Sequence, residues 1–124
     1  MAQYFFLYSG NEVESFGCGS GWNRIILDAL DKINAHIESL DDDTREDYNN
    51  GFRILQIKEK FGTLRIYTTF TSDIIEAIIE EAEQLSSVTC EACGAPGLLR
   101  CINNWYITAC NKCAKEYEEV RNAK

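Results

Sequence analysis

Two Cys-x-x-Cys pairs, Cys90-Glu91-Ala92-Cys93 and Cys110-Asn111-Lys112-Cys113, constrain the fold of this chain more than any other feature. Each pair offers two thiolates from one tight turn, and two such turns facing each other form the tetrahedral sulfur site that zinc prefers. The sixteen residues between the pairs match the spacing of a zinc ribbon. We therefore predict a zinc site formed by Cys90, Cys93, Cys110 and Cys113.

Four ordinary thiols, or two disulfides, are the alternative to a metal site. The chain opens with Met1-Ala2-Gln3-Tyr4-Phe5-Phe6, which has no basic segment and only a short apolar run, unlike a secretory signal. We therefore expect a cytoplasmic protein whose thiols stay reduced. A site of four cysteines leaves no open position for water or substrate, so its metal should hold the fold together and take no part in chemistry.

Cys101 lies between the two pairs and is a competing ligand. It could replace one of the four cysteines, or it could be a small buried hydrophobe in a strand running from Leu98 to Ile102. We favour the second interpretation, which leaves the four-cysteine set complete.

A chain of 124 residues is long enough for one compact domain with a modest core, and a bound zinc ion would add to its stability. No stretch approaches the length of a membrane span, and the single proline, Pro96, leaves no Pro-rich linker. We therefore expect an α+β core over residues 1–87, with the zinc ribbon over residues 88–124 packed against it in one compact unit.

Hydrophobic periodicity predicts a helix followed by a β-hairpin. From Trp22 to Leu40 apolar residues recur every three or four positions, which is typical of a helix with one buried face. The acidic stretch from Asp41 to Asn50 is expected to end this helix. Arg53–Lys60 and Leu64–Phe70 are rich in Ile, Leu, Tyr and Thr, which predicts two strands around a turn at Phe61-Gly62-Thr63.

A second helix, the ribbon and a short C-terminal helix complete the expected order of elements. Asp73 and Glu76 resemble the capping box that begins a helix. The apolar face of this second helix would consist of Ile74, Ile75, Ile78, Ile79, Ala82 and Leu85. The C-terminal helix would bury Ala114, Tyr117 and Val120. The aromatic run Gln3–Ser9 resembles a further strand.

The glycine-rich loop before the first helix is a candidate anion site, formed by Gly19, Ser20, Gly21 and Trp22. Backbone N–H groups at the start of a helix lack partners within it, and the helix dipole adds positive potential there, so this loop could hold a phosphate. The alternative is an ordinary helix start, because Gly-x-Gly alone lacks the full dinucleotide-binding spacing.

The predicted hairpin is a second candidate anion site. The net charge of −8 argues against a general nucleic-acid binder, yet residues 53–65 carry four basic side chains and one acidic side chain. Alternation along a strand places Lys58 and Lys60 on one face, and Arg65 and Tyr67 on one face of the partner strand. These groups could bind the phosphate and base of a nucleotide. Alternatively, the lysines pair with neighbouring acids and Tyr67 packs as an ordinary sheet aromatic. The sequence leaves open whether this face meets the glycine loop.

Two acidic surfaces support a competing function, in which the chain imitates nucleic-acid phosphate and blocks a basic groove on another protein. The residues concerned are Asp41, Asp42, Asp43, Glu46, Asp47, Glu76, Glu80, Glu81 and Glu83. A solvated acidic face that keeps the protein soluble explains the same residues. Asp41-x-Asp43-x-Arg45 does not fit a calcium loop, since Arg45 and Glu46 stand where an oxygen ligand and glycine are needed.

An enzyme is the least supported class of function. The only histidine, His36, falls on the polar flank of the first helix, where a surface residue is more common than a general base. Cys18 precedes a helix start and could have a lowered pKa, or it could simply pack in the loop. A zinc-ribbon regulator of nucleic acid is a further alternative, although the ribbon carries few basic residues and Glu116, Glu118 and Glu119 follow it.

Three motifs together resemble a family of small, mostly hypothetical proteins found in phages, prophages and bacteria. They are Cys18-Gly19-x-Gly21-Trp22, Lys58-Glu59-Lys60-Phe61-Gly62-x-Leu64-Arg65, and Cys90-Glu91-x-Cys93-Gly94-x-Pro96-Gly97. In that family the last metal ligand is often His, where this chain has Cys113, and the run Tyr4–Tyr8 lies outside the family pattern. The family label carries no activity with it.

The phage setting implies a binding role in the bacterial host cytoplasm. Small phage proteins inhibit antiviral defence by occupying a defence protein or by sequestering the nucleotide signal that activates it. We therefore expect a non-catalytic binding protein that has a zinc ribbon. Its expected ligand is a small anionic nucleotide, and the alternative partner is a host defence protein. Such proteins often build their pockets between subunits, so a homo-oligomer is compatible with this role.

Overall fold

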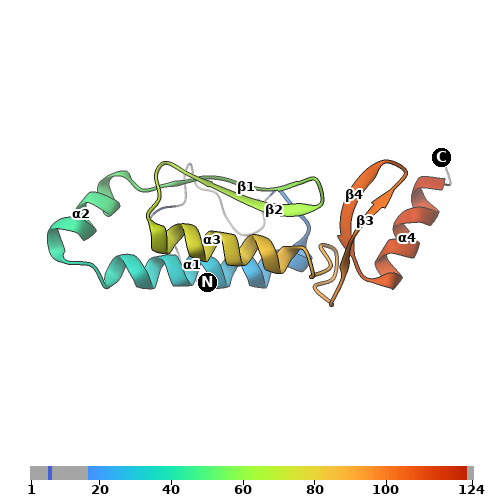
Figure 1. Ribbon diagram of the computed structural model, residues 1–124, viewed down its shortest axis with the longest axis horizontal. Coiled ribbons are helices and arrows are strands. Elements are labelled where there is room, and N and C mark those ends of the chain that lie inside the picture. The colour runs from blue at the N-terminus through green and yellow to red at the C-terminus, as the bar shows by residue number, and fades with distance from the viewer. Residues whose placement is uncertain (1–5, 7–16, 123–124) are drawn as a thin grey trace.

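The computed structural model describes Phe6 and residues 17–122, with the side chains of residues 119–122 excepted, and has the predicted α+β architecture. Its elements run along the chain in the order expected, with one helix added (Figure 1). They are the 3-10 turn η3 (Ser20–Trp22), α1 (Asn23–Glu38), α2 (Asp42–Gly51), β1 (Ile54–Lys60), β2 (Thr63–Thr68), α3 (Asp73–Ser86), β3 (Leu98–Ile102), β4 (Trp105–Ala109) and α4 (Asn111–Asn122).

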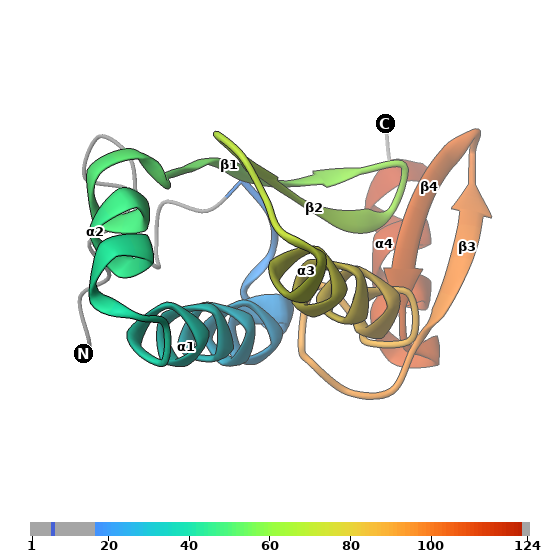
Figure 2. The same ribbon diagram turned by 60° about the vertical axis from the view of Figure 1, so that its left-hand side comes forward.

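The core lies between the antiparallel β1–β2 hairpin and the pair of helices α1 and α3, which lie side by side beneath it (Figure 2). The periodic apolar residues of α1 form its buried stripe, as predicted. On the hairpin, the inward residues Ile57, Leu64 and Ile66 face this stripe. Phe6 is also buried, and its ring contacts Phe52 edge-on at 5.7 Å. The rest of the N-terminal run predicted to form a strand lies outside the described residues.

Both edges of the hairpin have hydrogen-bond partners. Beside β2, Ser86 Oγ accepts a hydrogen bond of 2.9 Å from the N–H of Leu64, and Glu83 Oε2 accepts one of 3.3 Å from the N–H of Ile66. Beside β1, Gly17 donates to the carbonyl of Ile57 and accepts from the N–H of Glu59, each at 3.0 Å. These contacts satisfy backbone groups that a two-stranded sheet would otherwise expose.

The acidic stretch after α1 forms a helix, α2, where the sequence predicted only a helix end. Its start is fixed by Asp41, whose side chain accepts a hydrogen bond from the N–H of Thr44 at 3.2 Å. Arg45 forms an ion pair of 2.6 Å with Asp42 one turn earlier. No residue of α2 is fully buried, but Tyr48 packs against the core, with its ring 5.2 Å from that of Phe70, so the helix depends on both local contacts and packing.

Helix α3 begins one residue earlier than the predicted capping box implies. Its N-cap is Ser72, whose hydroxyl accepts from the N–H of Ile75, and Asp73 is the first helical residue. The predicted apolar face was also too wide. Ile75, Ile79 and Ala82 are buried as expected, whereas Ile74 is 55% exposed and Leu85 is 46% exposed.

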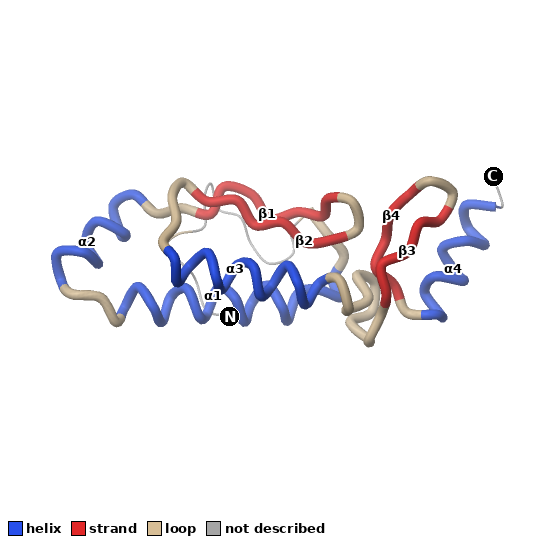
Figure 3. The backbone as a smooth tube through the Cα atoms, in the orientation of Figure 1, coloured by secondary structure: helices blue, strands red, loops and turns tan. Residues whose placement is uncertain are grey.

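The C-terminal ribbon is a second hairpin, β3–β4, followed by α4, with a small core of its own made of Cys90, Ile102, Ala109 and Ala114. Both hairpins close through two-residue turns in which both residues have positive φ: Phe61 and Gly62 in the first, Asn103 and Asn104 in the second. The turn of the first hairpin points at the side of the second (Figure 3). None of the helices in the described part of the chain is long and apolar enough to span a membrane.

Candidate metal centre and the junction around it

The four predicted ligands, Cys90, Cys93, Cys110 and Cys113, meet in one cluster whose sulfur atoms all lie within 4.8 Å of one another. The Sγ atoms of Cys93 and Cys110 are 3.8 Å apart. A disulfide needs about 2.05 Å, so these atoms are not bonded. A tetrahedral ion with metal–sulfur bonds of about 2.3 Å sets its ligands about 3.8 Å apart. The cluster therefore has the dimensions of a four-sulfur metal site.

Backbone turns aim the sulfur atoms inward. In the first pair, the N–H of Gly94 donates to the carbonyl of Cys90 at 2.9 Å, and Gly94 adopts a φ of +82°, which favours glycine. In the second pair, the N–H of Cys113 donates to Cys110 Sγ at 3.4 Å. Cys90 is fully buried. Donation of backbone N–H groups to a cysteine sulfur is expected to favour the thiolate that metal binding requires.

The pKa values of the four thiols shift in different directions, down at Cys90 and Cys110 and up at Cys93 and Cys113. Burial raises the pKa of Cys90, but N–H groups of Cys110, Cys93 and Ala92 outweigh burial and hold this pKa at about 6. Hydrogen bonding to the sulfurs of Cys110 and Cys90 raises the pKa of Cys113 to about 12. Thiols this close cannot all ionise unless a cation lies between them.

Cys101 takes no part in the cluster. It lies on β3, as predicted, but its side chain is exposed and not buried as expected. The expectation failed because β3 and β4 form a two-stranded ribbon, in which one face of each strand meets solvent. Cys101 is therefore an exposed thiol outside the metal cluster, and the four-cysteine set remains complete.

The glycine-rich loop contacts the cysteine cluster directly. The N–H of Gly19 donates to Glu91 Oε2 at 2.9 Å, and the N–H of Gly21 donates to the main-chain carbonyl of Glu91 at 2.7 Å. A Cβ atom on Gly21 would collide with the carbonyl oxygens of Cys90 and Glu91. The two glycine N–H groups predicted to face a phosphate are thus engaged by the chain itself, one of them by a carboxylate. Ser20, between them, is exposed.

Trp22 belongs to the same contact and does not face a ligand. Its side chain is fully buried, and its indole Nε1 donates to the main-chain carbonyl of Thr89 at 2.9 Å. Trp22 therefore anchors the start of α1 to the segment that leads into Cys90.

A further contact joins the first hairpin to the ribbon. Gly62, at the tip of the β1–β2 hairpin, accepts a hydrogen bond of 2.7 Å from the buried hydroxyl of Thr108 on β4. We call the contacts of Gly19, Gly21, Trp22 and Gly62 with the ribbon the junction. All three sequence motifs meet there, which no local pattern in the sequence indicated.

The predicted basic groups of the hairpin do lie together. Lys58 pairs directly with Arg65 across the strands, and Lys60 and Tyr67 lie two residues further along their own strands, on the same face. The ammonium of Lys58 is 5.7 Å from the centre of the Tyr67 ring. We call these four residues the basic face. Among the described residues no ion pair engages its three cations, contrary to the alternative that the lysines pair with neighbouring acids.

Arg65 also has a role within its own strand. Its Nη1 donates to Thr63 Oγ1 at 2.7 Å and to the carbonyl of Leu64 at 2.9 Å. Arg65 also lines a shallow pocket together with Glu80 and Glu83 of α3, so it lies between the basic face and the acidic side of that helix.

Several of the acidic residues have structural partners. Glu81 forms an ion pair of 2.6 Å with Lys32 on α1, and Glu83 accepts from the edge of β2. Asp41 and Asp42 stabilise α2 as described above. The other predicted acids, Asp43, Glu46, Asp47, Glu76 and Glu80, are exposed.

The candidate catalytic residues form no pair. His36 is only partly exposed on α1, and its carbonyl accepts from the hydroxyl of Ser39 at 2.6 Å. Burial and the nearby carboxylates of Glu91 and Glu59 raise the pKa of Cys18 to about 11. The hypothesis of a lowered pKa at Cys18 is therefore wrong, because burial of the thiol and the two carboxylates outweigh the helix start, and Cys18 packs against the core as the alternative held.

Comparison with protein-family models, curated proteins and solved structures finds no match to this chain. The resemblance to small phage proteins accordingly stays a prediction from the three motifs.

Proposed function

We propose that the four cysteines hold one structural zinc ion, and that the protein binds a small anionic nucleotide on the basic face without transforming it. The observation that carries the binding role is the gathering of Lys58, Lys60, Arg65 and Tyr67 on one side of the hairpin, with no acid paired to the cations in the described part of the chain.

Zinc is the ion best suited to the cluster. Thiolates are soft ligands, and a closed tetrahedral set of four favours zinc or an iron–sulfur centre. The spacing of two Cys-x-x-Cys turns on a β-hairpin is typical of zinc ribbons. Residues Cys90, Cys93, Cys110 and Cys113 would supply all four ligands, so the metal would link the ribbon to the segment that carries the junction.

The charge pattern favours a small anion over a polyanion. A net charge of −8 repels nucleic acid over long range, whereas a local cluster of three cations attracts a few phosphate groups at short range. Arg65 can bind a phosphate through two N–H groups, and the lysines act as point charges. Tyr67 adds an exposed ring beside them.

The resemblance to phage proteins gives this binding a biological setting. A phage protein that captures a signalling nucleotide would prevent activation of a host defence enzyme. Sequestration needs affinity and no catalysis.

Calorimetry against cyclic di-AMP, cyclic di-GMP and ADP-ribose tests the proposal. Lys58→Glu and Arg65→Glu should each weaken binding by about tenfold or more, because each removes a charge-assisted phosphate contact worth about 1.5–3 kcal/mol. Glu46→Lys, which changes an exposed acid of α2 by two charges in the opposite direction, is the control. The released nucleotide should be chemically intact by chromatography.

Two results would contradict the proposal. If no nucleotide binds, the basic face is a solvated surface. If instead Glu80→Lys and Glu81→Lys abolish inhibition of a defence protein while the hairpin variants do not, the acidic surface is the functional one.

A further inference from the structure

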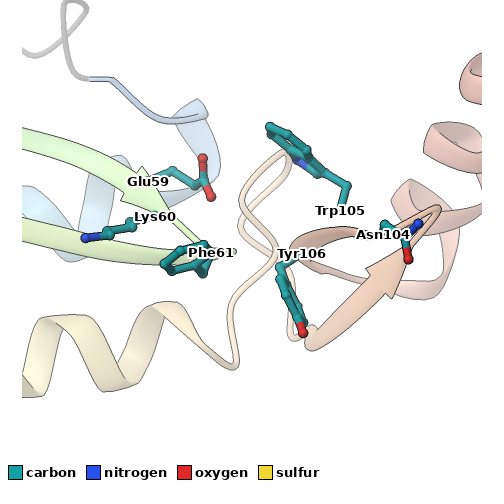
Figure 4. Close-up of a pocket in the computed structure, with 6 residues that line it drawn as sticks. All are labelled: Glu59, Lys60, Phe61, Asn104, Trp105 and Tyr106. Atoms are coloured by element: carbon teal, nitrogen blue, oxygen red, sulfur yellow. The ribbon is translucent and has the colours of Figure 1, made fainter.

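A pocket of about 300 Å³ lies where the two hairpins meet. Glu59, Lys60 and Phe61 line it from the first hairpin, and Asn104, Trp105 and Tyr106 line it from the second (Figure 4). Its volume is at the lower end of the range for small-molecule sites, about 300–1,000 Å³, so it suits one ring system and not an extended peptide.

Aromatic rings dominate this pocket. Figure 4 shows Phe61 and Tyr106 on opposite sides of the gap between the hairpins, with the indole of Trp105 on a third side. The side chains are 67%, 47% and 52% exposed, respectively. Apolar rings gathered at one exposed place mark a binding site more often than a solvated surface.

The backbone holds Phe61 at this position against its own preference. Phe61 has a φ of +53°, a region that bulky residues rarely adopt. The next residue, Gly62, is fixed to β4 by the hydroxyl of Thr108. An exposed phenylalanine with positive φ, next to a glycine that is fixed to the ribbon, points to a function for its ring.

Polar groups at the pocket complement a heterocyclic ring. Glu59 uses Oε2 to accept the N–H of Gly62 at 2.8 Å, and Oε1 is a further acceptor on the same carboxylate. Asn104 offers an amide. The ammonium of Lys60 lies 5.7 Å from the centre of the Phe61 ring, so this residue borders the pocket while it belongs to the basic face.

We propose that this pocket holds the base of the nucleotide, a purine that offers N–H donors to Glu59 and stacks between Phe61 and Tyr106. This inference rests on the proposed function. Lys60 joins the two parts of the site, because it is shared by the pocket and the basic face. Lys58 precedes Lys60 by two residues on β1, a separation of about 7 Å, which is the scale of the sugar and phosphates of one nucleotide.

Variants that remove a ring but keep the backbone test the pocket. Phe61→Asn is suitable because asparagine tolerates positive φ, and Tyr106→Thr suits a strand. Leu55→Thr, which removes exposed apolar surface from β1 away from the pocket, is the control. Unchanged circular dichroism and metal content would show that each variant is folded.

The probes are ADP-ribose, cyclic di-AMP and cyclic di-GMP, with ribose 5-phosphate as a ligand that lacks a base. Phe61→Asn and Tyr106→Thr should weaken nucleotide binding by about tenfold, as expected for loss of base stacking, and leave ribose 5-phosphate binding unchanged. Lys58→Glu should weaken both kinds of ligand. Quenching of Trp105 gives a second readout, because the other tryptophan, Trp22, is fully buried.

The outcomes separate this inference from the proposed function. If nucleotides bind and depend on Lys58 but not on Phe61 or Tyr106, the base lies elsewhere and only the inference fails. If no nucleotide binds at all, both fail. Binding of tetramethylammonium that is lost in Phe61→Asn, with no nucleotide binding, would assign the pocket to a cation instead.

Discussion

The hydroxyl of Thr108 donates a hydrogen bond of 2.7 Å to the carbonyl of Gly62, and these two residues stand 46 positions apart in the sequence. Thr108 is fully buried, so water does not compete for this bond. Gly62 has a φ of +86°, and a Cβ atom there would lie 2.7 Å from Leu99 Cδ1. One hydrogen bond therefore holds the tip of the first hairpin against the ribbon, and the lack of a side chain at Gly62 allows this close approach.

Replacing Thr108 with valine should lower the free energy of unfolding by about 1–3 kcal/mol. The shape of the side chain is kept, but the carbonyl of Gly62 is left buried without a donor. Thr68→Val, on β2, should change stability by about 0.5 kcal/mol or less, since no buried hydrogen bond is lost there. Urea unfolding of both variants measures the difference, and equal effects would show that the Thr108 contact contributes nothing.

Removing Cys90 should release the metal and unfold the ribbon. We expect elemental analysis to give about one zinc ion per chain in the native protein and little in Cys90→Ser, because binding free energy at such a site is folding free energy. Cys101→Ser should keep full zinc content, since its exposed side chain lies outside the cluster. A Cys90→Ser protein with the same melting temperature as the native one would refute a structural metal.

Gly21→Ala should destabilise the protein by about 1–3 kcal/mol, the cost of overpacking at a rigid contact. The added methyl group would collide with main-chain oxygens of Cys90 and Glu91, which cannot rotate away. Gly51→Ala is the matched control, since its Cβ would meet only the ring of Phe70, at 3.4 Å. We expect that variant to be neutral or stabilising in thermal denaturation, because alanine suits a helix better than glycine.

Cys18 should resist alkylation near neutral pH. Its pKa is raised from 9.0 to about 11, so the folded protein keeps the thiol protonated where an ordinary cysteine already ionises. The contribution of the protonated Cys18 thiol to the free energy of unfolding is fully present below pH 9 and is lost as the pH rises towards 11. Iodoacetamide labelling of the zinc-loaded protein at pH 8, followed by peptide mapping, should modify the exposed Cys101 well before Cys18.

The parts of the fold that depend on hydrophobic period could be predicted from the sequence. The stripe of α1 and the alternation of β2 bury the residues that their patterns indicate. On β1 a bulge between Ile54 and Gln56 interrupts the alternation, and Leu55 is exposed. Helix α2 could not be found in this way, because Tyr48 is its one apolar residue packed against the core and its start depends on the cap at Asp41. Ile74 and Leu85 were predicted to lie in the core because the periodicity of a sequence does not show which residues of a helix the neighbouring elements cover.

In the candidate site, too, local features could be predicted from the sequence and long-range contacts could not. The metal ligands are readable because each pair lies within one turn, so chemistry and spacing are local. The roles of Gly19 and Trp22 were missed because their partners, Glu91 and Thr89, lie 72 and 67 positions away. A glycine that permits close approach and a glycine that faces a phosphate look alike in sequence. Only the position of the partner distinguishes them.

The contacts of Ser86 and Glu83 with β2 also bear on how copies of this chain can meet. An exposed strand edge is a template on which a strand from another molecule can add, and such addition leads to swapped dimers or fibrils. On β2 the N–H groups of Leu64 and Ile66 are already bonded to side chains of α3. Extension of the sheet by a strand of another copy is therefore disfavoured at the β2 edge, because α3 already occupies its N–H groups.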